Sequence, residues 1–372
     1  MKFKILKSTI FKSVSHLHGI VDKKNTLPIL SNILIEAKDN SLVLSSTDMD
    51  ISIIERLNCD ILEEGSTTIN SQIFYDIIRK LDDNSEIEVI SNNGKILTIR
   101  SSGSRFSLSC LPKEDYPIIE QNNEDNINIK INSTTLSKLI DKTRFAISNE
   151  ETRYFLNGLY FNLNNESEKT LLTLVGTDGH RLAKFSFPLE NKIEKLCGVI
   201  IPKKTINELS KLLSETDQEI EILISSTKIV FLINNLVLIS KLIDGNFPDY
   251  KRVIPEENNN VLELNRENLL SAVDRVSTVV NEKSPVIKLK LLKDQINLNT
   301  ANNDNSTATE DLSAHYNGDE FEIGFNSKYV MDIVNNLEDE IISINFKDSS
   351  SPIIAQEKSN PNLVYVLMPM RV

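Results

Sequence analysis

One pattern of helix, strands, second helix and further strands recurs three times along this 372-residue chain. The second helix of the pattern has apolar residues at spacings of three and four, typical of an amphipathic helix, and a strand-like run follows it each time. Its copies are NSQIFYDIIRKLDDNSEIEVI (70–90), PKKTINELSKLLSETDQEIEILI (202–224) and NSKYVMDIVNNLEDEIISINF (326–346). The first helix is predicted over residues 7–21, 132–148 and 265–281. Such duplication predicts three copies of one supersecondary unit.

Between the helices, short runs alternate apolar and polar residues, as half-buried strands do. Examples are SLVLSS (41–46), KILTIRS (95–101), LYFNLN (159–164), IVFLIN (229–234) and VIKLKLL (286–292). Two helices over antiparallel strands form an α+β unit. We therefore expect an α+β fold of three tandem repeats, over residues 1–119, 129–250 and 260–372. Polar linkers are expected at 120–128 and 255–260. Duplication alone leaves open whether the repeats form an arc or three independent domains.

Charge and cysteine usage exclude several classes of protein. The net charge of −12 argues against coating nucleic acid by bulk attraction, although it allows locally basic surfaces. Cys59, Cys110 and Cys197 form no CxxC pair, which indicates thiols in a reducing cytosol and no zinc site. No apolar run approaches the roughly 20 residues of a membrane span. The lysine-rich start MKFKILKSTIFK lacks a signal-peptide core, so we expect a cytoplasmic location.

The stretch LVGTDGHRLA (174–183) places polar side chains around a glycine. An Asp-Gly pair between two alternating runs is typical of a hairpin turn. A catalytic loop built on Asp178 and His180 is a second interpretation, but the sequence contains no GxSxG, HExxH or P-loop pattern. A third is a recognition surface that also uses the methionines of VLMPM near the chain end, since methionine side chains adapt to varied partners.

Seven segments together resemble the bacterial sliding clamp family, the beta subunit of DNA polymerase III. They are TLPILSNILIEA (26–37), SRFSLSCLP (104–112), TRYFLNGLYF (152–161), TDGHRLA (177–183), KLIDGNFPDYKRVIP (241–255), IGFNSKYVMDIV (323–334) and YVLMPMRV (365–372). They occur in matching order over essentially the whole chain. The resemblance implies that three clamp repeats form half of a closed ring, with helices lining the hole. It implies no catalysis and no cofactor or metal.

The resemblance also implies partners. Two chains join head to tail into a homodimer around double-stranded DNA, irrespective of its sequence. The ring tethers the alpha subunit of the replicative polymerase, the clamp-loader complex and other proteins with a clamp-binding motif. A peptide scaffold that never meets DNA remains an alternative.

The family's peptide pocket lies between the second and third repeats, and TDGHRL forms one wall of it. Partner motifs insert a glutamine and bulky apolar side chains there, and we expect His180 and Arg181 to orient the peptide without doing chemistry. The matching positions are Leu156, Thr177, Gly179, His180, Arg181, Leu182, Pro248, Arg252, Val253, Asn326, Tyr329, Val366, Met368, Pro369, Met370 and Arg371.

DNA contacts are expected from locally basic helices and from the family's DNA-contacting loops. Contacts from lysine and arginine to phosphate are blind to sequence and therefore permit sliding. Phe155 replaces the tyrosine of many relatives and lacks its hydroxyl, and the third repeat carries acids on both helices. The expected residues are Lys12, Lys24, Arg79, Arg153, Tyr154, Phe155, Lys203 and Lys204.

Ring closure is expected to bring the end of repeat one against the start of repeat three of the second chain. The first side contributes Arg100, Arg105, Phe106 and Leu108, and the second contributes Val279, Asp304, Glu310 and Asp311. Ile73 and Gly103 stand where the family often has basic residues, so we expect weaker ion pairing. Exposed ion pairs contribute about 0–1 kcal/mol each, so they tune closure.

Overall fold

The chain divides into two compact units in a computed structural model. The first contains Met1–Ser137 and Lys204–Leu242, and the second contains Lys138–Lys203 and Ile243–Val372. The structure describes residues 1–21, 27–92, 94–117, 126–166, 169–194, 196–280, 285–301 and 306–371. Most of the predicted linker 120–128 lies outside the described residues. Each unit contains strands of more than one repeat, so its bounds differ from those of the repeats. The three repeat ranges therefore stay a prediction.

The first unit contains two antiparallel sheets in the part of the chain described. The five-stranded sheet has the order β5 (Asp60–Glu63), β1 (Lys2–Leu6), β7 (Glu86–Asn92), β8 (Ile96–Ser101), β9 (Ser104–Ser109). The eight-stranded sheet has the order β10 (Ile127–Asn132), β15 (Glu219–Ile224), β16 (Lys228–Ile233), β17 (Leu236–Lys241), β4 (Ile51–Asn58), β3 (Ser41–Thr47), β2 (Asn32–Lys38), β6 (Gly65–Asn70). The pairing of β17 with β4 joins strands of repeats two and one.

The second unit follows the same plan over its described residues. Its nine-stranded sheet has the order β14 (Gly198–Pro202), β11 (Gly158–Glu166), β12 (Lys169–Thr177), β13 (Arg181–Pro188), β26 (Leu363–Leu367), β25 (Ile353–Gln356), β24 (Ile341–Phe346), β18 (Asn260–Asn265), β22 (His315–Tyr316). Its four-stranded sheet has the order β21 (Thr307–Ser313), β20 (Gln295–Ala301), β19 (Val286–Leu292), β23 (Phe321–Asn326). Here β13 pairs with β26, so strands of repeats two and three share one sheet.

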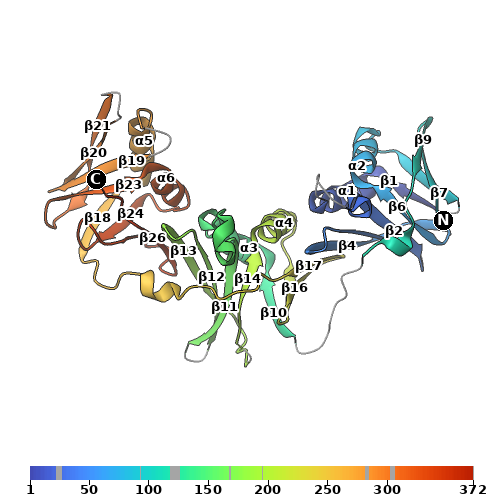
Figure 1. Cartoon of the computed structure of the whole chain (residues 1–372), viewed down its shortest axis with the longest axis horizontal. Coiled ribbons are helices and arrows are strands. Elements are labelled where there is room, and N and C mark those ends of the chain that lie inside the picture. The colour runs from blue at the N-terminus through green and yellow to red at the C-terminus, as the bar shows by residue number, and fades with distance from the viewer. Residues whose placement is uncertain are drawn as a thin grey trace. The chain divides into compact units, whose positions relative to one another are not determined.

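Six α-helices occur in the described ranges. They are α1 (Lys7–Ile20), α2 (Ser71–Lys80), α3 (Ser133–Asp141), α4 (Lys203–Leu213), α5 (Arg266–Ser277) and α6 (Ser327–Asn335). Helices α1 and α2 lie side by side in the first unit, as α5 and α6 do in the second (Figure 1). Asn70, Asn265 and Asn326 cap α2, α5 and α6 because each side chain accepts a backbone N–H of the first turn. The predicted α+β alternation is confirmed.

The predicted helix over 132–148 is wrong beyond Asp141. The chain continues through a turn into the 3-10 helix η3 (Arg144–Ala146). The Thr143 hydroxyl donates to the carbonyl of Leu139 at 2.7 Å, a back-bond that competes with helix continuation. Strand β12 also approaches closely, because a Cβ on Gly176 would lie 2.5 Å from the Thr143 carbonyl oxygen. Residue 281 of the predicted helix 265–281 lies outside the described residues, and α5 itself ends at Ser277.

Buried aromatic side chains form the cores between helices and sheets. Phe3, Phe74 and Phe231 are fully buried in the first unit, and Phe325 and Tyr316 are fully buried in the second. None of the helices in the described part of the chain is both long and apolar enough to span a membrane.

Candidate functional site

The Asp-Gly stretch of the second repeat forms a tight turn between β12 and β13. Asp178 Oδ1 accepts the N–H groups of His180 and Arg181 at 2.9 and 3.1 Å. The Thr177 hydroxyl accepts the N–H of Gly179 and donates to the carbonyl of Arg181 at 2.6 Å. Gly179 has a φ of +87°, which favours glycine. The hairpin interpretation is therefore confirmed.

The guanidinium of Arg181 is fixed by several partners. Its Nε lies 3.1 Å from Asp178 Oδ2, and its Nη1 lies 2.5 Å from Asp332 Oδ2. Its Nη2 donates to the carbonyl of Phe145 at 2.9 Å. The Tyr329 ring centroid lies 4.3 Å from Arg181 Cζ, within cation–π range. Arg181 therefore braces the turn against α6 and is preorganised.

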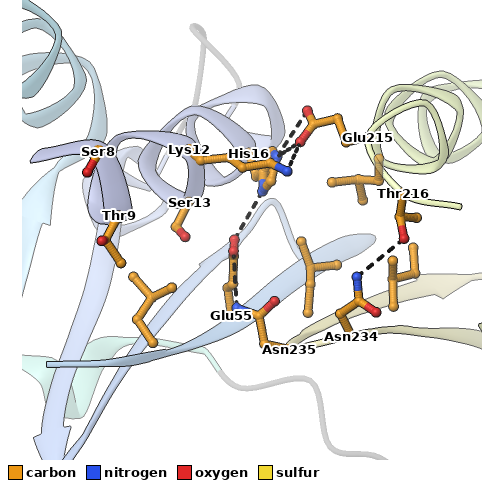
Figure 2. A pocket seen from close by; sticks show the side chains of 14 residues that line it. Ser8, Thr9, Lys12, Ser13, His16, Glu55, Glu215, Thr216, Asn234 and Asn235 are labelled. Atoms are coloured by element: carbon orange, nitrogen blue, oxygen red, sulfur yellow. Dashed lines mark hydrogen bonds and ion pairs between the residues drawn. The ribbon is translucent and has the colours of Figure 1, made fainter. Parts of the chain in front are cut away.

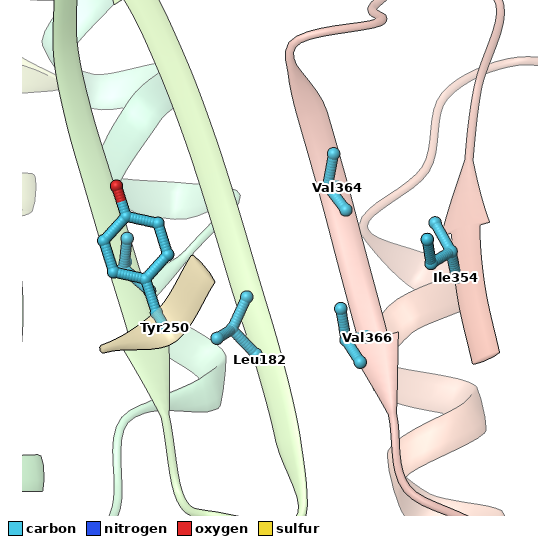
Figure 3. Close-up of a cluster of buried hydrophobic side chains, with 6 residues drawn as sticks. Leu182, Tyr250, Ile354, Val364 and Val366 are labelled. Atoms are coloured by element: carbon cyan, nitrogen blue, oxygen red, sulfur yellow. The ribbon is translucent and has the colours of Figure 1, made fainter. Parts of the chain in front are cut away.

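An apolar cluster lies where β13 meets β26. Leu182 and Val175 pack with Tyr250 of the 3-10 helix η5 (Tyr250–Val253) and with three residues of the third repeat, Ile354, Val364 and Val366. Figure 3 shows Tyr250 and Leu182 on one side and the third-repeat residues on the other. The cluster thus joins strands of the two repeats through apolar burial.

The rim of this cluster carries exposed apolar groups. Met368 is 38% exposed and Val253 is 43% exposed. The N–H of Met368 donates to the carbonyl of His180 at 2.9 Å, and the N–H of Met370 donates to that of Gly324 at 2.8 Å. The chain end is therefore tied to the turn and to β23.

All sixteen residues predicted for the peptide pocket lie in the second unit. The structure brings together the turn, Leu182, Val366, Met368 and Tyr329, and the His180 and Tyr329 ring centroids lie 6.4 Å apart. Leu156 is buried at the end of the 3-10 helix η4 (Glu151–Leu156), and Asn326 caps α6. Pro248, Arg252 and Arg371 are exposed, while Pro369 and Met370 are half-buried. Burial raises the pKa of Tyr329, so the phenol stays neutral.

Sequence reasoning missed Asp332 as a residue of this site. It lies on α6, three residues after Tyr329, and helix geometry places such residues on one face. That spacing could have placed Asp332 beside Tyr329 from the sequence alone. The contact of Asp332 with Arg181, 151 residues away in sequence, could not be predicted from neighbouring residues.

The cations predicted to contact DNA are engaged within the chain. Lys12 pairs with Glu215, Arg79 with Asp76 and Arg153 with Glu150, all within 3.2 Å. Lys203 donates to Asn149 at 2.6 Å, and Lys204 pairs with Asp48 at 2.5 Å. Tyr154 is 55% exposed and its ring meets that of Phe155 edge-on. Lys24 lies outside the described residues.

The residues predicted for a dimer interface lie at two sheet edges. Phe106 and Leu108 are half-buried on β9, the edge of the five-stranded sheet. Arg105 directly precedes Phe106 on the same strand, and Arg100 on β8 pairs with Glu88. Glu310 and Asp311 lie on β21, the edge of the four-stranded sheet, and Val279 follows α5. Asp304 lies outside the described residues.

Three family models match the chain in succession. They describe the N-terminal, central and C-terminal domains of the DNA polymerase III beta subunit, over residues 1–120, 130–249 and 251–371. The beta sliding clamp of Caulobacter vibrioides is 39% identical and that of Escherichia coli K12 is 34% identical, each over 100% of both chains.

Solved structures agree with the sequence matches. The sliding clamp (DNA polymerase III subunit beta) of Bartonella birtlesii aligns with a TM-score of 0.97 at 40% identity, over 100% of both chains. The DNA polymerase III subunit beta of Pseudomonas aeruginosa aligns with a TM-score of 0.95 at 33% identity, again over 100% of both chains. The chain belongs to the DNA polymerase III beta subunit family of sliding clamps, whose members are processivity factors rather than catalytic enzymes.

Proposed function

We propose that this chain is a cytoplasmic DNA sliding clamp that closes as a head-to-tail homodimer around duplex DNA and tethers the replicative polymerase. Three repeats, with the boundaries expected from the sequence, form one half of the ring. Family membership over the full length supports the function. The strand pairing at the repeat junctions carries the proposal for the dimer.

Both internal junctions use the same antiparallel pairing. At the first junction β4 pairs with β17, with Ile53 opposite Leu238. At the second junction β13 pairs with β26, with Ala183 opposite Tyr365. In each case the fourth strand of one repeat meets the last strand of the next repeat. Repeat three has its own fourth strand, β21, and repeat one has its own last strand, β9.

The last strands of the three repeats can be aligned by the position of each residue along the strand. Phe106 is the third residue of β9, as Leu238 is of β17 and Tyr365 is of β26. Leu238 and Tyr365 are fully buried at their junctions, whereas Phe106 is half-buried. A second copy of the chain would complete the burial of Phe106, as apolar groups at a stable interface require.

The fourth strands of the repeats show which residue of β21 would lie opposite Phe106. Ala183 pairs with Gly176 on the preceding strand, and Ala308 pairs with Thr300. Gly176 and Thr300 are equivalent because each lies two residues after a fully buried leucine. Pairing β21 with β9 of a second copy in the junction register therefore places Ala308 opposite Phe106.

The charges of the two edges are complementary. The β9 side carries Arg100 and Arg105, and the β21 side carries Glu310 and Asp311. Complementary charges steer association and disfavour wrong partners. Repeating the β21 edge against a second β21 edge would place like charges together, so the head-to-tail arrangement is favoured.

Confinement of DNA explains why strong cation contacts are not needed. Lys12, Arg79, Arg153, Lys203 and Lys204 each have an acceptor within the chain, so a phosphate gains each cation only by competing with that acceptor. Weak contacts that exchange readily suit movement along the duplex.

The apolar cluster around Leu182 supports a pocket for partner peptides in the second unit. Met368 and Val253 expose apolar surface at its rim, and Arg181 holds the turn in one conformation. Few polar groups around an apolar centre suit the binding of anchor residues. We propose the pocket residues predicted from the sequence, and we include Asp332 as the residue that positions Arg181.

Mass in solution and retention on DNA test the proposal together. We expect a mass of about twice 42.1 kDa. We also expect retention on nicked circular DNA after loading by clamp loader and ATP, and loss of that retention when the DNA is linearised. Leu108→Asp on the interface face of β9 should yield a single chain that is not retained. Ser107→Asp, on the opposite face of the same strand, is the matched control. A single-chain mass for the wild type at every concentration would refute the ring.

A further inference from the structure

The first repeat junction carries an ionic contact between a helix and a loop. Lys12 Nζ and His16 Nε2, both on α1, lie 2.7 and 3.1 Å from Oε2 of Glu215. Glu215 lies in the loop between α4 and β15. Figure 2 shows the three side chains converging from the two elements. A cation of repeat one thereby holds an acid of repeat two.

The second junction repeats this contact with different residues. Lys138 Nζ on α3 and Lys142 Nζ just after it lie 3.1 and 2.7 Å from the carboxylate of Glu338. Glu338 lies in the loop between α6 and β24. Two independent occurrences at equivalent places indicate that the contact is a property of the junction between repeats.

The loop after α2 carries the acidic half of a third contact. A leucine at the end of each second helix, Leu81, Leu213 or Leu337, is followed by Asp82-Asp83, Ser214-Glu215 or Glu338-Asp339. Asp82 and Asp83 thus fill both positions that are acidic in the other loops. The Asp83 side chain is 92% exposed, even though Lys7 contacts it at 2.5 Å. Among the described residues, the cation that contacts this loop, Lys7, belongs to repeat one itself, whereas the loops after α4 and α6 are held by cations of the repeat before them.

Helix α5 carries the cationic half. Leu136 and Leu269 are equivalent fully buried residues of α3 and α5, and Lys142 and Arg275 each follow six residues later. Arg275 is 60% exposed, and its guanidinium lies 2.5 and 3.0 Å from the two carboxylate oxygens of Glu310. Glu310 lies on β21, the edge strand that the proposed dimer would cover.

We propose that Arg275 of one copy pairs with Asp82 and Asp83 of the second copy when the ring closes. This inference rests on the proposed head-to-tail dimer. As β9 of the second copy meets β21, Arg105 of that strand becomes a new partner for Glu310, and Arg275 is released toward the two aspartates. Each ring then contains the same helix-to-loop contact at all six junctions, four within chains and two between them.

A charge swap tests the contact. Arg275→Asp alone and the pair Asp82→Arg with Asp83→Arg alone should each raise the dimer dissociation constant about tenfold or more, measured by sedimentation. Arg275→Asp combined with Asp82→Arg and Asp83→Arg should restore it to within about threefold of wild type. Glu267→Lys, on an exposed position of α5, is the control for a change of net charge.

The alternatives give different results. If Arg275 acts only through Glu310, Arg275→Asp will be rescued by Glu310→Arg and not by the aspartate swap, which overturns the inference. Unchanged dissociation constants for both reversals also overturn it. Thermal unfolding of each variant identifies loss of folding, and the combined variant still tests the contact because restored dimerisation requires a folded chain. A wild type that never dimerises refutes the ring itself, whereas a dimeric wild type with insensitive variants refutes only this contact.

Discussion

The Nδ1 atom of His16 lies 3.1 Å from Oε2 of Glu55, while Nε2 of the same ring lies 3.1 Å from Oε2 of Glu215. A histidine that donates from both nitrogens carries a positive charge. Glu55 belongs to β4 and Glu215 to the loop after α4, so one imidazolium joins repeats one and two. Lys12 and Asn235 complete the surroundings of the two carboxylates (Figure 2).

This arrangement predicts a pH-dependent contribution to stability. Burial lowers the pKa of His16, but the hydrogen bonds and charges of Glu55 and Glu215 outweigh burial and raise the pKa above its ordinary value. A raised pKa means that the stabilisation is complete below the unfolded pKa of about 6.5 and is lost as the pH rises through the folded pKa. His16→Gln should therefore cost about 1–3 kcal/mol at about pH 6 and less at about pH 9, measured by urea unfolding. His315→Gln, which removes a 66% exposed histidine, is the control. A cost for His16→Gln that does not change with pH would contradict the charged form.

Exposed methionine at the rim of the apolar cluster predicts a large effect on peptide binding. Met368→Glu places a carboxylate where an apolar anchor should pack, so the affinity for a clamp-binding peptide of the polymerase should fall at least about tenfold. Fluorescence anisotropy with a labelled peptide measures this. Met49 is the matched control because it is 43% exposed on the corresponding turn of repeat one. Met49→Glu should leave the affinity unchanged, and equal losses for both variants would refute the proposed pocket.

The fixed guanidinium of Arg181 predicts a cost in folding stability. Its side chain is 10% exposed, and Asp178 beside it is 13% exposed. Arg181→Met leaves that carboxylate without its buried cation and should cost about 3 kcal/mol in denaturant unfolding. Arg252 makes the same type of contact with Asp249, three residues away, but is 84% exposed. Arg252→Met should cost about 1 kcal/mol or less, and similar costs for the two variants would show that burial is not decisive.

Local periodicity predicted most of the fold. The alternation in 41–46 and 229–234 and the helical spacing in 7–21 depend on neighbours within a few residues, and β3, β16 and α1 form there. The helix over 132–148 was wrong because the Thr143 hydroxyl and the close approach of β12 both act at its end. The approach of β12 comes from sequence-distant backbone that no local window contains.

In the candidate site, too, local features were predictable from the sequence, and contacts between residues far apart in sequence were not. The turn at Asp178 was predictable because its hydrogen bonds join residues two or three apart. The partners of Arg181 and His16 were not predictable, since Asp332 and Glu215 lie 151 and 199 residues away from them. Among the described residues no group of three or more His, Cys, Asp or Glu side chains could hold a metal ion.

The carboxylate of Glu338 is held by two lysines that differ in burial, which predicts different costs for their removal. Glu338 accepts from Lys142, whose side chain is 10% exposed, and from Lys138, which is 48% exposed. Lys142 also donates to the carbonyl of Asn336 at 2.7 Å. Lys142→Met leaves that carbonyl with only the longer bond from the Tyr365 hydroxyl, at 3.3 Å, and removes the less exposed partner of Glu338. It should cost about 1–3 kcal/mol, whereas Lys138→Met should cost about 1 kcal/mol or less.

The two lysines also predict a response to acid. Hydrogen bonds from Lys142 and then Lys138 lower the pKa of Glu338, so the stabilisation is present above the unfolded pKa of the carboxyl group and is lost as the pH falls through the folded pKa. The difference in unfolding free energy between wild type and Lys142→Met should therefore shrink on acidification. Part of it should persist, because the bond to the Asn336 carbonyl does not titrate. A larger cost for Lys138→Met than for Lys142→Met at neutral pH would show that exposed charge, and not the buried hydrogen bonds of Lys142, holds this junction together.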